Sequence, residues 1–400
     1  MMSQYNSYKW HGTNNNGKKI QGIIIATNRI TAKINLYEQN INIKKITKQF
    51  FLIKSIKTQT KDIYLFTKQL AILINSGIPL IKCLEILIYS QKNLTFKQII
   101  DTIKYTIISG GSLAMAFKQH PQLFNKLFCN LIAIGEQTGT IDIILNKIIT
   151  HQDKIIHINK KIKLALTYPI IILLLTILIT SVLLIFIIPQ FQLLFANLNT
   201  ELPVATLFII QVAQLLQKFW PLLIIFYIIC HYALIYGYKY SLKCQFILDF
   251  LILKIPVIGN LIRKTIISRI MSTLHITNEA GLPLLESLQA TRNIVHNIFY
   301  NQAISNIYTD INTGQQLEQA FKNTLLFPHF VTQMIAIGEE SGNLEQIFNK
   351  IALYYDEEID TIVNTIHNLL NPIIITILGI IIGGLVIIMY LPIFTLGSTM

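Results

Sequence analysis

The first pattern with chemical meaning is a possible phosphate-binding loop near the N-terminus. Residues 12–18 (GTNNNGK) fit the spacing GxxxxGK, in which backbone amides and a lysine hold the phosphates of a nucleotide. The next residue, however, is Lys19, where bound magnesium requires the hydroxyl group of a serine or threonine. No buried strand pattern precedes the loop and no helical pattern follows it. We therefore interpret residues 12–18 as a β-turn and not as a nucleotide site.

Other residue types that could catalyse a reaction or bind a metal occur without the required spacing. The nine histidines include no HExxH and no pair four residues apart, and the four cysteines form no CxxC. Acidic side chains gather between Tyr354 and Asp360, where they could hold a divalent cation, although a solvated acidic face is the simpler interpretation. The sequence therefore predicts no enzymatic activity, no cofactor and no metal centre.

The composition places a large part of the chain away from water. Of 400 residues, 52% are hydrophobic and only 13% are charged, whereas soluble domains carry about 25% charged residues. Long uncharged stretches account for this deficit, and each can cross the roughly 30 Å hydrocarbon core of a bilayer. We predict three transmembrane helices, at residues 164–188, 218–238 and 372–395. An outside loop at 189–217 and a juxtamembrane segment at 361–371 complete this arrangement.

Basic residues predict the orientation of the spans, because cytoplasmic flanks retain positive charge. Residues 1–163 carry 23 Lys and Arg against 7 Asp and Glu, whereas residues 189–217 carry no basic residue. We therefore expect a cytoplasmic N-terminus and a C-terminus on the opposite side. The lysines just before the first span are expected to contact anionic lipid; they are Lys154, Lys160, Lys161 and Lys163. No basic stretch interleaves with aromatic residues, so we expect no nucleic acid as a partner.

The chain contains an internal repeat at an offset of 203 to 204 residues. NSGIPLIKCLE from Asn75 matches EAGLPLLESLQ from Glu279, and IAIGEQTG from Ile132 matches IAIGEESG from Ile335. Apolar residues recur every three or four positions, as in amphipathic helices. We predict two homologous cytoplasmic helical-bundle domains, residues 62–163 and 239–360, each continuing towards a membrane helix. The expected fold class is therefore mostly α, a polytopic membrane protein.

Glycine and proline mark equivalent breaks between helices in the two copies. Gly77 and Pro79 match Gly281 and Pro283, where glycine would end one helix and proline would begin the next. A second pair of breaks reads GEQTG and GEESG, with the glycines Gly135, Gly139, Gly338 and Gly342.

We interpret the GEQTG and GEESG segments as tight turns between helices. Thr140 or Asn343 would then cap the helix that follows. In addition, Glu136 and Glu339 could contact a partner protein.

Proline and glycine also mark the predicted membrane helices. The prolines that bracket the first and third spans are Pro169, Pro189, Pro372 and Pro392. Gly379 and Gly383 form a GxxxG pattern, which would allow a second helix to approach closely, either within one chain or in a homo-oligomer; the alternative is that the glycines only make the helix flexible.

Residues 1–40 differ from the rest of the chain. β-branched residues between Ile20 and Ala26 follow a turn-forming cluster at Asn14 to Gly17, which predicts a small N-terminal module that contains strands. The lysine-rich residues 41–61 are predicted to be a basic linker or a helix near the headgroups.

Several motifs together resemble one protein family over nearly the whole chain. They are the breaks at Gly77 and Gly281, the GExxG segments at Gly135 and Gly338, ALTYP at Ala165–Pro169, ELP at Glu201–Pro203, KIPVIGNLIRK at Lys254–Lys264 and MYLPIF at Met389–Phe394. This set resembles the inner-membrane platform proteins of type IV pilus assembly machines (PilC-like), whose sister is the F protein of type II secretion systems. The opening YKWHG is more similar to the pilus branch. One departure is Asn371-Pro372, where the family commonly has Glu-Pro, so no role of that acid is transferred.

The resemblance implies a multi-pass protein of the bacterial inner membrane that is not an enzyme, with its C-terminus in the periplasm and the loop at 189–217 periplasmic. The implied partners are a hexameric pilus assembly or retraction ATPase, pilins and other inner-membrane pilus assembly proteins. A transporter or channel is the contrasting interpretation, but apart from Lys218, the first residue of the second span, the predicted spans contain no Asp, Glu, Lys or Arg for a transport site.

Overall fold

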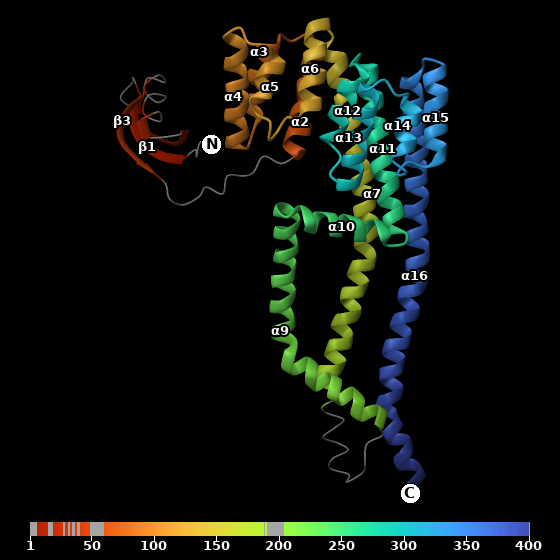
Figure 1. Ribbon diagram of the computed structural model, residues 1–400. Coiled ribbons are helices and arrows are strands. Elements are labelled where there is room, and N and C mark those ends of the chain that lie inside the picture. The colour runs from red at the N-terminus through yellow and green to blue at the C-terminus, as the bar shows by residue number, and fades with distance from the viewer. Residues whose placement is uncertain are drawn as a thin grey trace. The chain divides into compact units, whose positions relative to one another are not determined.

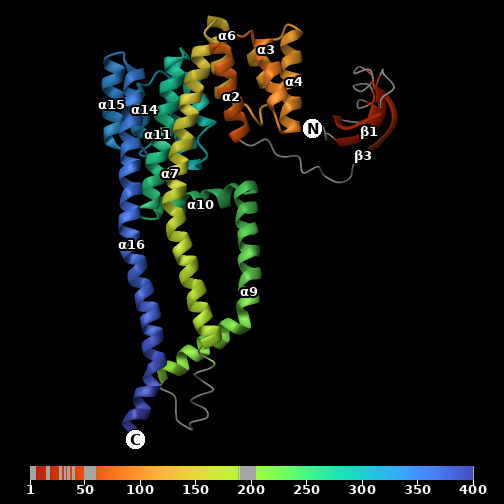
Figure 2. The same cartoon turned by 180° about the vertical axis from the view of Figure 1, so that it is seen from behind.

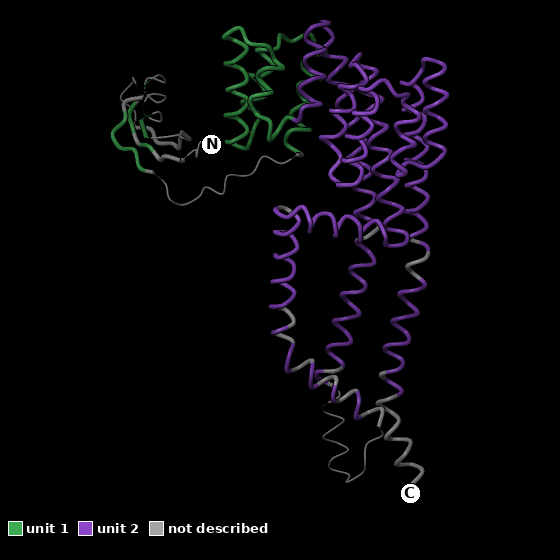
Figure 3. Tube along the Cα trace, viewed as in Figure 1, with its two compact units in different colours: residues 1–124 green, residues 125–400 purple. Residues whose placement is uncertain are grey.

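The computed structural model describes residues 6–14, 19–26, 29–30, 33, 37, 41–48, 60–187, 189 and 204–399. The chain divides into two compact units, residues 1–124 and residues 125–400 (Figure 3). Apart from a small N-terminal sheet, the described residues are mostly helical. The predicted mostly α fold and the strand-containing N-terminal module are therefore confirmed.

The N-terminal sheet has three antiparallel strands in the order β2-β1-β3. They are β1 (Asn6–Asn14), β2 (Lys19–Ala26) and β3 (Ile41–Lys48). Trp10 of β1 lies opposite Gly22 of β2 and Ile46 of β3, and the Trp10 and Ile46 side chains are buried.

The third strand corrects the predicted linker at residues 41–61, because residues 41–48 belong to the sheet. Ile43 and Ile46 are three residues apart, which hides the alternation of a strand in the sequence. A bulge opposite His11 and Gly12 takes up the extra residue and restores the alternation. Residues 49–59 of the predicted linker and residues 15–18 of the predicted turn lie outside the described residues.

Described residues 60–124 of the first unit form four helices around an aromatic core. They are α2 (Thr60–Asn75), α3 (Leu80–Ser90), α4 (Leu94–Ile108) and α5 (Leu113–Lys118). The Phe66 ring meets the Phe96 ring edge to face with centroids 5.5 Å apart, and Phe117 lies 4.4 Å from Phe124. Asn93 and Ser112 accept backbone N–H groups at the starts of α4 and α5, which is why these helices begin where they do.

The second unit holds the remaining helices. They are α6 (Lys126–Thr138), α7 (Ile141–Val182) with the π-helical turn η1 (Leu183–Ile187), α9 (Val204–Tyr240), α10 (Leu242–Lys254), α11 (Ile258–Glu279), α12 (Leu284–Arg292), α13 (Ile298–Asn312), α14 (Leu317–Asn323), α15 (His329–Glu340) and α16 (Leu344–Thr399). A continuous apolar core around Met271, Tyr300, Phe321 and Phe348 joins α11 to α16.

The helices of the two copies correspond one to one at the repeat offset. The ends of α2 and α11 match, as do the starts of α3 and α12, α4 and α13, and α5 and α14. Buried rings occupy equivalent core positions: Phe117 and Phe124 in the first copy match Phe321 and Phe327 in the second, where the two centroids are 4.7 Å apart. The same periodic pattern of apolar residues therefore gives the same order of helices twice.

The last helix of each copy continues far beyond its bundle. In Figures 1 and 2, α7 and α16 extend side by side, α9 runs apart from them, and α10 crosses between α9 and the bundle. Pro169 lies inside α7, and Pro372 and Pro392 lie inside α16, so the helices continue through these prolines, and their place at the ends of membrane spans remains a prediction. Pro189 follows η1.

Among the described residues, one helix, α7, is long and apolar enough to cross a membrane, in agreement with the first predicted span. The pair α10 and α11 would add a second only if the two helices were one broken span, and they meet at an angle of 108°. Shorter apolar segments, Ile225–Tyr238 and Pro372–Gly384, fall within the second and third predicted spans, which remain predictions. Residues 204–217 of the predicted outside loop are helical, and residues 190–203 lie outside the description.

Candidate functional site

The candidate site is the contact between the long helix of the first copy and two helices of the second. The helix α7 packs along α11 and α16 within the second unit (Figures 1 and 2). We define the seam as this line of contacts, from Lys147 to Lys161 on α7. It runs along α11, from Glu279 at the end of that helix towards the level where α7 and α16 continue beyond the bundle.

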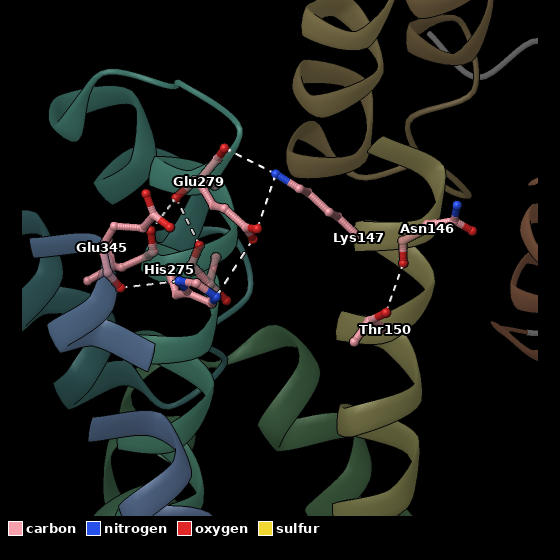
Figure 4. A network of polar contacts seen from close by, with 9 residues as sticks. Asn146, Lys147, Thr150, His275, Glu279 and Glu345 are labelled. Atoms are coloured by element: carbon pink, nitrogen blue, oxygen red, sulfur yellow. Dashed lines mark hydrogen bonds and ion pairs between the residues drawn. The ribbon is translucent and has the colours of Figure 1, made fainter. Parts of the chain in front are cut away.

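The end of the seam farthest from the long helical extensions is a polar network around Glu279 (Figure 4). Lys147 of α7 donates to the backbone oxygen of Glu279 at 3.1 Å and pairs with its Oε1 at 3.3 Å. His275 lies one turn earlier on α11, with its Nε2 3.7 Å from Oε2 of Glu279 and its Nδ1 3.2 Å from the backbone oxygen of Glu345. Lys147 therefore satisfies one of the carbonyl groups that every helix leaves open at its C-terminus.

The next contact buries a histidine. His151 is 8% exposed, and its Nε2 lies 3.4 Å from Oγ1 of Thr273. The hydroxyl hydrogen of Thr273 is directed to the backbone oxygen of Arg269 at 2.7 Å, so Nε2 of His151 is the donor in this pair. Burial, together with the positive charges of Lys154 and Arg269 and with the neighbouring His275, lowers the pKa of His151 to about 4. The seam thus holds a neutral imidazole at neutral pH.

Asp356 of α16 is the centre of the seam. Its Oδ2 lies 2.6 Å from Nζ of Lys154, and its Oδ1 accepts a hydrogen bond of 2.5 Å from the Ser268 hydroxyl of α11. The Lys154 and Asp356 side chains are 24% and 22% exposed, which reduces screening by water and salt. One carboxylate therefore joins three helices from both copies of the repeat.

Two further ion pairs continue the seam. Nζ of Lys161 lies 2.7 and 2.8 Å from the two carboxylate oxygens of Asp360, and Lys264 of α11 pairs with Glu358. The Lys264 ammonium group lowers the pKa of Glu358. Between the ion pairs, apolar side chains close the interface; they are Ile158 and Ile162 of α7 with Leu261, Ile359, Val363 and Ile366.

These pairs modify the expectation of a solvated acidic face. Asp356, Glu358 and Asp360 each pair with a lysine of α7 or α11, and the Asp360 side chain is still 46% exposed. Lys154 and Lys161 contact these carboxylates, Lys160 and Lys163 are exposed, and contact of the four lysines with anionic lipid remains a prediction. No group of three or more metal-binding side chains occurs in the described part of the chain.

Sequence reasoning missed the seam, although a signal was present. Lys147, Lys154 and Lys161 are spaced by seven residues, which places them on one face of a helix, and His151 lies on the same face. This spacing predicts a helix–helix contact in a chain whose other copy carries acids at Asp356 and Asp360. The expectation that the four lysines contact anionic lipid depended only on how close they lie to the first predicted span in the sequence.

The glycines of the GExxG segments have two different roles in the structure. Gly139 and Gly342 take φ of +70° and +67°, the left-handed conformation that ends α6 and α15. Gly135 and Gly338 lie inside the helices, where a Cβ on Gly338 would come within 3.0 to 3.1 Å of Ile347 and Leu344. The turn is therefore shorter than predicted, and the first glycine instead allows close packing of consecutive helices.

The predicted cap at Thr140 is wrong, because its side chain accepts no backbone N–H of α7. Its Oγ1 instead lies 2.6 Å from Oγ1 of Thr138. At the other break, Gly77 and Gly281 have φ of +76° and +84°. Pro79 and Pro283 occupy the N-cap positions of α3 and α12. A Cβ at Gly379 or Gly383 would meet nothing within 4 Å, and the predicted helix contact there remains a prediction.

Glu339 is a capping residue for another helix. Its Oε1 and Oε2 accept the backbone N–H groups of Leu317 and Glu318 at 2.8 and 3.1 Å, at the start of α14. The carboxylate therefore satisfies two open donors at the positive end of that helix. A role of Glu136 or Glu339 in partner binding remains a prediction, and any such role of Glu339 would compete with this cap.

We expect Glu339→Ala to lower the free energy of unfolding by about 2 kcal/mol, because two N–H groups lose a charged acceptor. The matched control is Glu340→Ala, since Glu340 is the exposed neighbour. The measurement is thermal unfolding of the full chain in detergent. Equal unfolding temperatures of the two variants would show that the cap contributes nothing.

A cavity of about 670 Å³ is lined by residues of α6, α12, α13 and the connection between α12 and α13, and these include Lys126, Arg292 and His296. Its lining contains basic, polar and apolar side chains and no acid.

Comparison with known proteins shows the family to which this chain belongs. The sequence model of the family described as "Type II secretion system (T2SS), protein F" matches residues 66–189 and 270–392, one match in each copy of the repeat. The internal repeat predicted from the sequence is thereby confirmed.

Relatives of nearly equal length carry names from two systems. A type IV pilus assembly protein PilC of Pseudomonas aeruginosa is 36% identical over 92% of this chain and 98% of its own length. A type IV pilus assembly protein TapC of Aeromonas hydrophila is 32% identical over 98% and 96%. A type II secretion system protein F of Aeromonas hydrophila is 27% identical over 85% and 87%.

Proposed function

Because the chain belongs to the family of type II secretion system protein F, we propose that it is the inner-membrane platform of a type IV pilus assembly machine. In this role it couples a cytoplasmic hexameric ATPase to the insertion and extraction of pilins during pilus biogenesis. The pilus system is favoured over secretion because the relatives named for pilus assembly are 36% and 32% identical, against 27% for the secretion protein.

The single observation that carries the coupling role is the seam. A force applied to one copy reaches the long helices of both only if the copies are held together at their base. Lys154, Asp356 and Ser268 make this connection with one carboxylate, and the apolar layer around Ile359 excludes water beside it. Such a part transmits displacement and needs no catalytic group.

The proposal includes the membrane arrangement predicted from the sequence. Spans at residues 164–188, 218–238 and 372–395 would place the N-terminus in the cytoplasm and the C-terminus in the periplasm. The apolar character of α7 supports the first span. Pilins and other inner-membrane assembly proteins would contact these helices, and the open surface at Gly379 and Gly383 suits a homo-oligomer.

The alternative is the F protein of a type II secretion system. The family description and the Aeromonas hydrophila secretion protein favour this function. Neighbouring genes would separate the two: a pilin peptidase and pilus ATPases indicate the pilus, whereas a secretin-linked gene set indicates secretion.

The test is a deletion strain complemented from a plasmid. We expect deletion to abolish surface filaments seen by electron microscopy, while the amount of the pilus ATPase stays normal. The intact gene should restore the filaments, and secreted proteins should be unchanged. Normal filaments in the deletion strain would overturn the proposal, and loss of secretion with normal filaments would establish the alternative.

A further inference from the structure

The short helix α10 is fixed to the second bundle by one face. Asp249, which is 4% exposed, accepts the backbone N–H of Ile298 at 2.8 Å and the hydroxyl of Tyr238 at 3.2 Å. On the same helix, the rings of Phe246 and Phe250 touch Phe299 with centroids 4.8 and 6.2 Å apart. The position of α10 on α13 is therefore defined by a buried carboxylate at the start of α13.

The corner between α10 and α11 is also built into the chain. The two helices meet at 108°, and Val257 at the corner takes φ of +66°. A Cβ at Gly259 would collide with the backbone oxygen of Leu253, to which Arg263 donates at 3.2 Å. These contacts hold α10 across the direction of α7 and α9, as Figures 1 and 2 show.

The surface of α10 that the bundle leaves uncovered is apolar, and it includes the exposed parts of Phe246 and Phe250. It carries five large side chains that are 44% to 75% exposed: Leu242, Phe246, Ile247, Phe250 and Leu251. At 100° per residue these side chains lie on one half of the helix, and Lys243 and Lys254 lie on the same half near its two ends. Residues 242–254 contain a single acid, Asp249, which lies just outside this half and is buried against the start of α13. We define the five exposed apolar residues together with Lys243 and Lys254 as the exposed arc.

The charges on α10 and its orientation relative to α7 indicate what covers the exposed arc. An apolar helix face with lysines at its ends and no acid suits the boundary between acyl chains and anionic headgroups, where the lysine stems lie on apolar surface and the ammonium groups reach phosphate. Nζ of Lys254 already lies 4.8 Å from the centre of the Phe250 ring. A helix that crosses the direction of α7 lies parallel to the bilayer surface if α7 spans the bilayer.

We infer that α10 is an interfacial helix whose exposed arc lies in the headgroup layer of an anionic leaflet and holds the second bundle against the membrane. This inference rests on the proposed membrane insertion of α7. It also explains why α10 is so apolar although it lies outside the core. Lys154 and Lys161 are engaged in the seam, so Lys243 and Lys254 provide positive charge for lipid at this point.

The test uses spin labels on the full chain in vesicles of phosphatidylcholine and phosphatidylglycerol. Labels are placed at Phe250→Cys on the exposed arc, Gln302→Cys on the exposed side of α13 and Leu174→Cys on α7. The background is Cys230→Ser with Cys244→Ser, while Cys83 and Cys129 are buried and remain unlabelled. We expect the label at 250 to collide several-fold less with a water-soluble nickel complex than the label at 302. Ile247→Cys repeats the measurement in case position 250 does not tolerate a label.

The outcomes separate this inference from the proposed function. A label at 174 that is open to nickel would overturn the membrane arrangement itself. A shielded label at 174 with an open label at 250 would overturn only the interfacial helix. Dipolar broadening at 250 that disappears on dilution with unlabelled chains would indicate a second copy as the occupant and would also overturn it.

The headgroup charge is tested separately with Lys243→Glu plus Lys254→Glu. We expect this double variant to lose most of the shielding at 250, and vesicles of phosphatidylcholine alone to reduce it for the unchanged chain. The matched control is Lys118→Glu plus Lys350→Glu, which alters charge equally at exposed sites. Shielding that depends neither on these lysines nor on phosphatidylglycerol would contradict the role of anionic lipid.

Discussion

Asp356→Lys is expected to destabilise the second unit by on the order of 3 kcal/mol and to abolish surface filaments. The variant loses the contacts to Lys154 and Ser268 and introduces a second ammonium group beside that of Lys154. Breaking a largely buried ion pair by changing one partner leaves the other charge without compensation. The effect is measured as the shift in unfolding of the full chain in detergent and as filaments on complemented cells.

The charge-swapped variant distinguishes the seam from a general loss of stability. Lys154→Asp combined with Asp356→Lys restores opposite charges, and the Ser268 hydroxyl can then accept from the new lysine. We expect the pair to recover at least half of the lost stability and to restore filaments. The control is Glu357→Lys, one residue away on α16. If the swap stays as defective as the single variant, the pair does not act as a connection between the copies.

Lowering the pH from 7 to 4 is expected to reduce the free energy of unfolding by about 3 kcal/mol through His151 alone. Its pKa is about 4 in the fold, against 6.5 for the free side chain. Between these values the unfolded chain binds a proton that the folded chain does not, so acid favours unfolding. The contribution of His151 to the free energy of unfolding is fully present above pH 6.5 and is lost progressively as the pH falls towards 4.

His151→Gln tests this dependence, because a glutamine amide can still donate to Thr273 and does not titrate. We expect the pH dependence of its unfolding to be shallower than that of the unchanged chain by the same 3 kcal/mol. His157→Gln, on the exposed side of α7, is the control and should keep the full dependence. Parallel pH curves for the two glutamine variants would contradict the low pKa of His151.

Local patterns predicted much of the fold. The repeat, the helical character of both copies and the strands at the N-terminus follow from periodicity and from glycine and proline, which act over a few residues. The same reasoning failed at β3, since a bulge conceals the alternation. The helices α7 and α16 continue through Pro169 and Pro372, because a long apolar helix tolerates the loss of one backbone hydrogen bond at each proline.

The candidate site was predicted less well, because its members are far apart in the chain. Glu339 was identified as a residue of interest, yet its acceptor role depends on where α14 begins, 21 to 22 residues earlier. Asp356 was assigned to a solvated face because its neighbours in sequence are polar. Only its position opposite Lys154 removes it from water.

The amino-acid sequence by itself determined that this protein has two like helical copies, apolar segments beside them and an excess of positive charge towards the N-terminus. The tertiary structure alone decided how that charge is used, since Lys154 and Lys161 of one copy meet Asp356 and Asp360 of the other across about 200 residues of chain. An ion pair depends on a separation of a few ångströms in space. Sequence spacing sets such a separation within one helix but not between two, so the pairing is a property of the packed molecule.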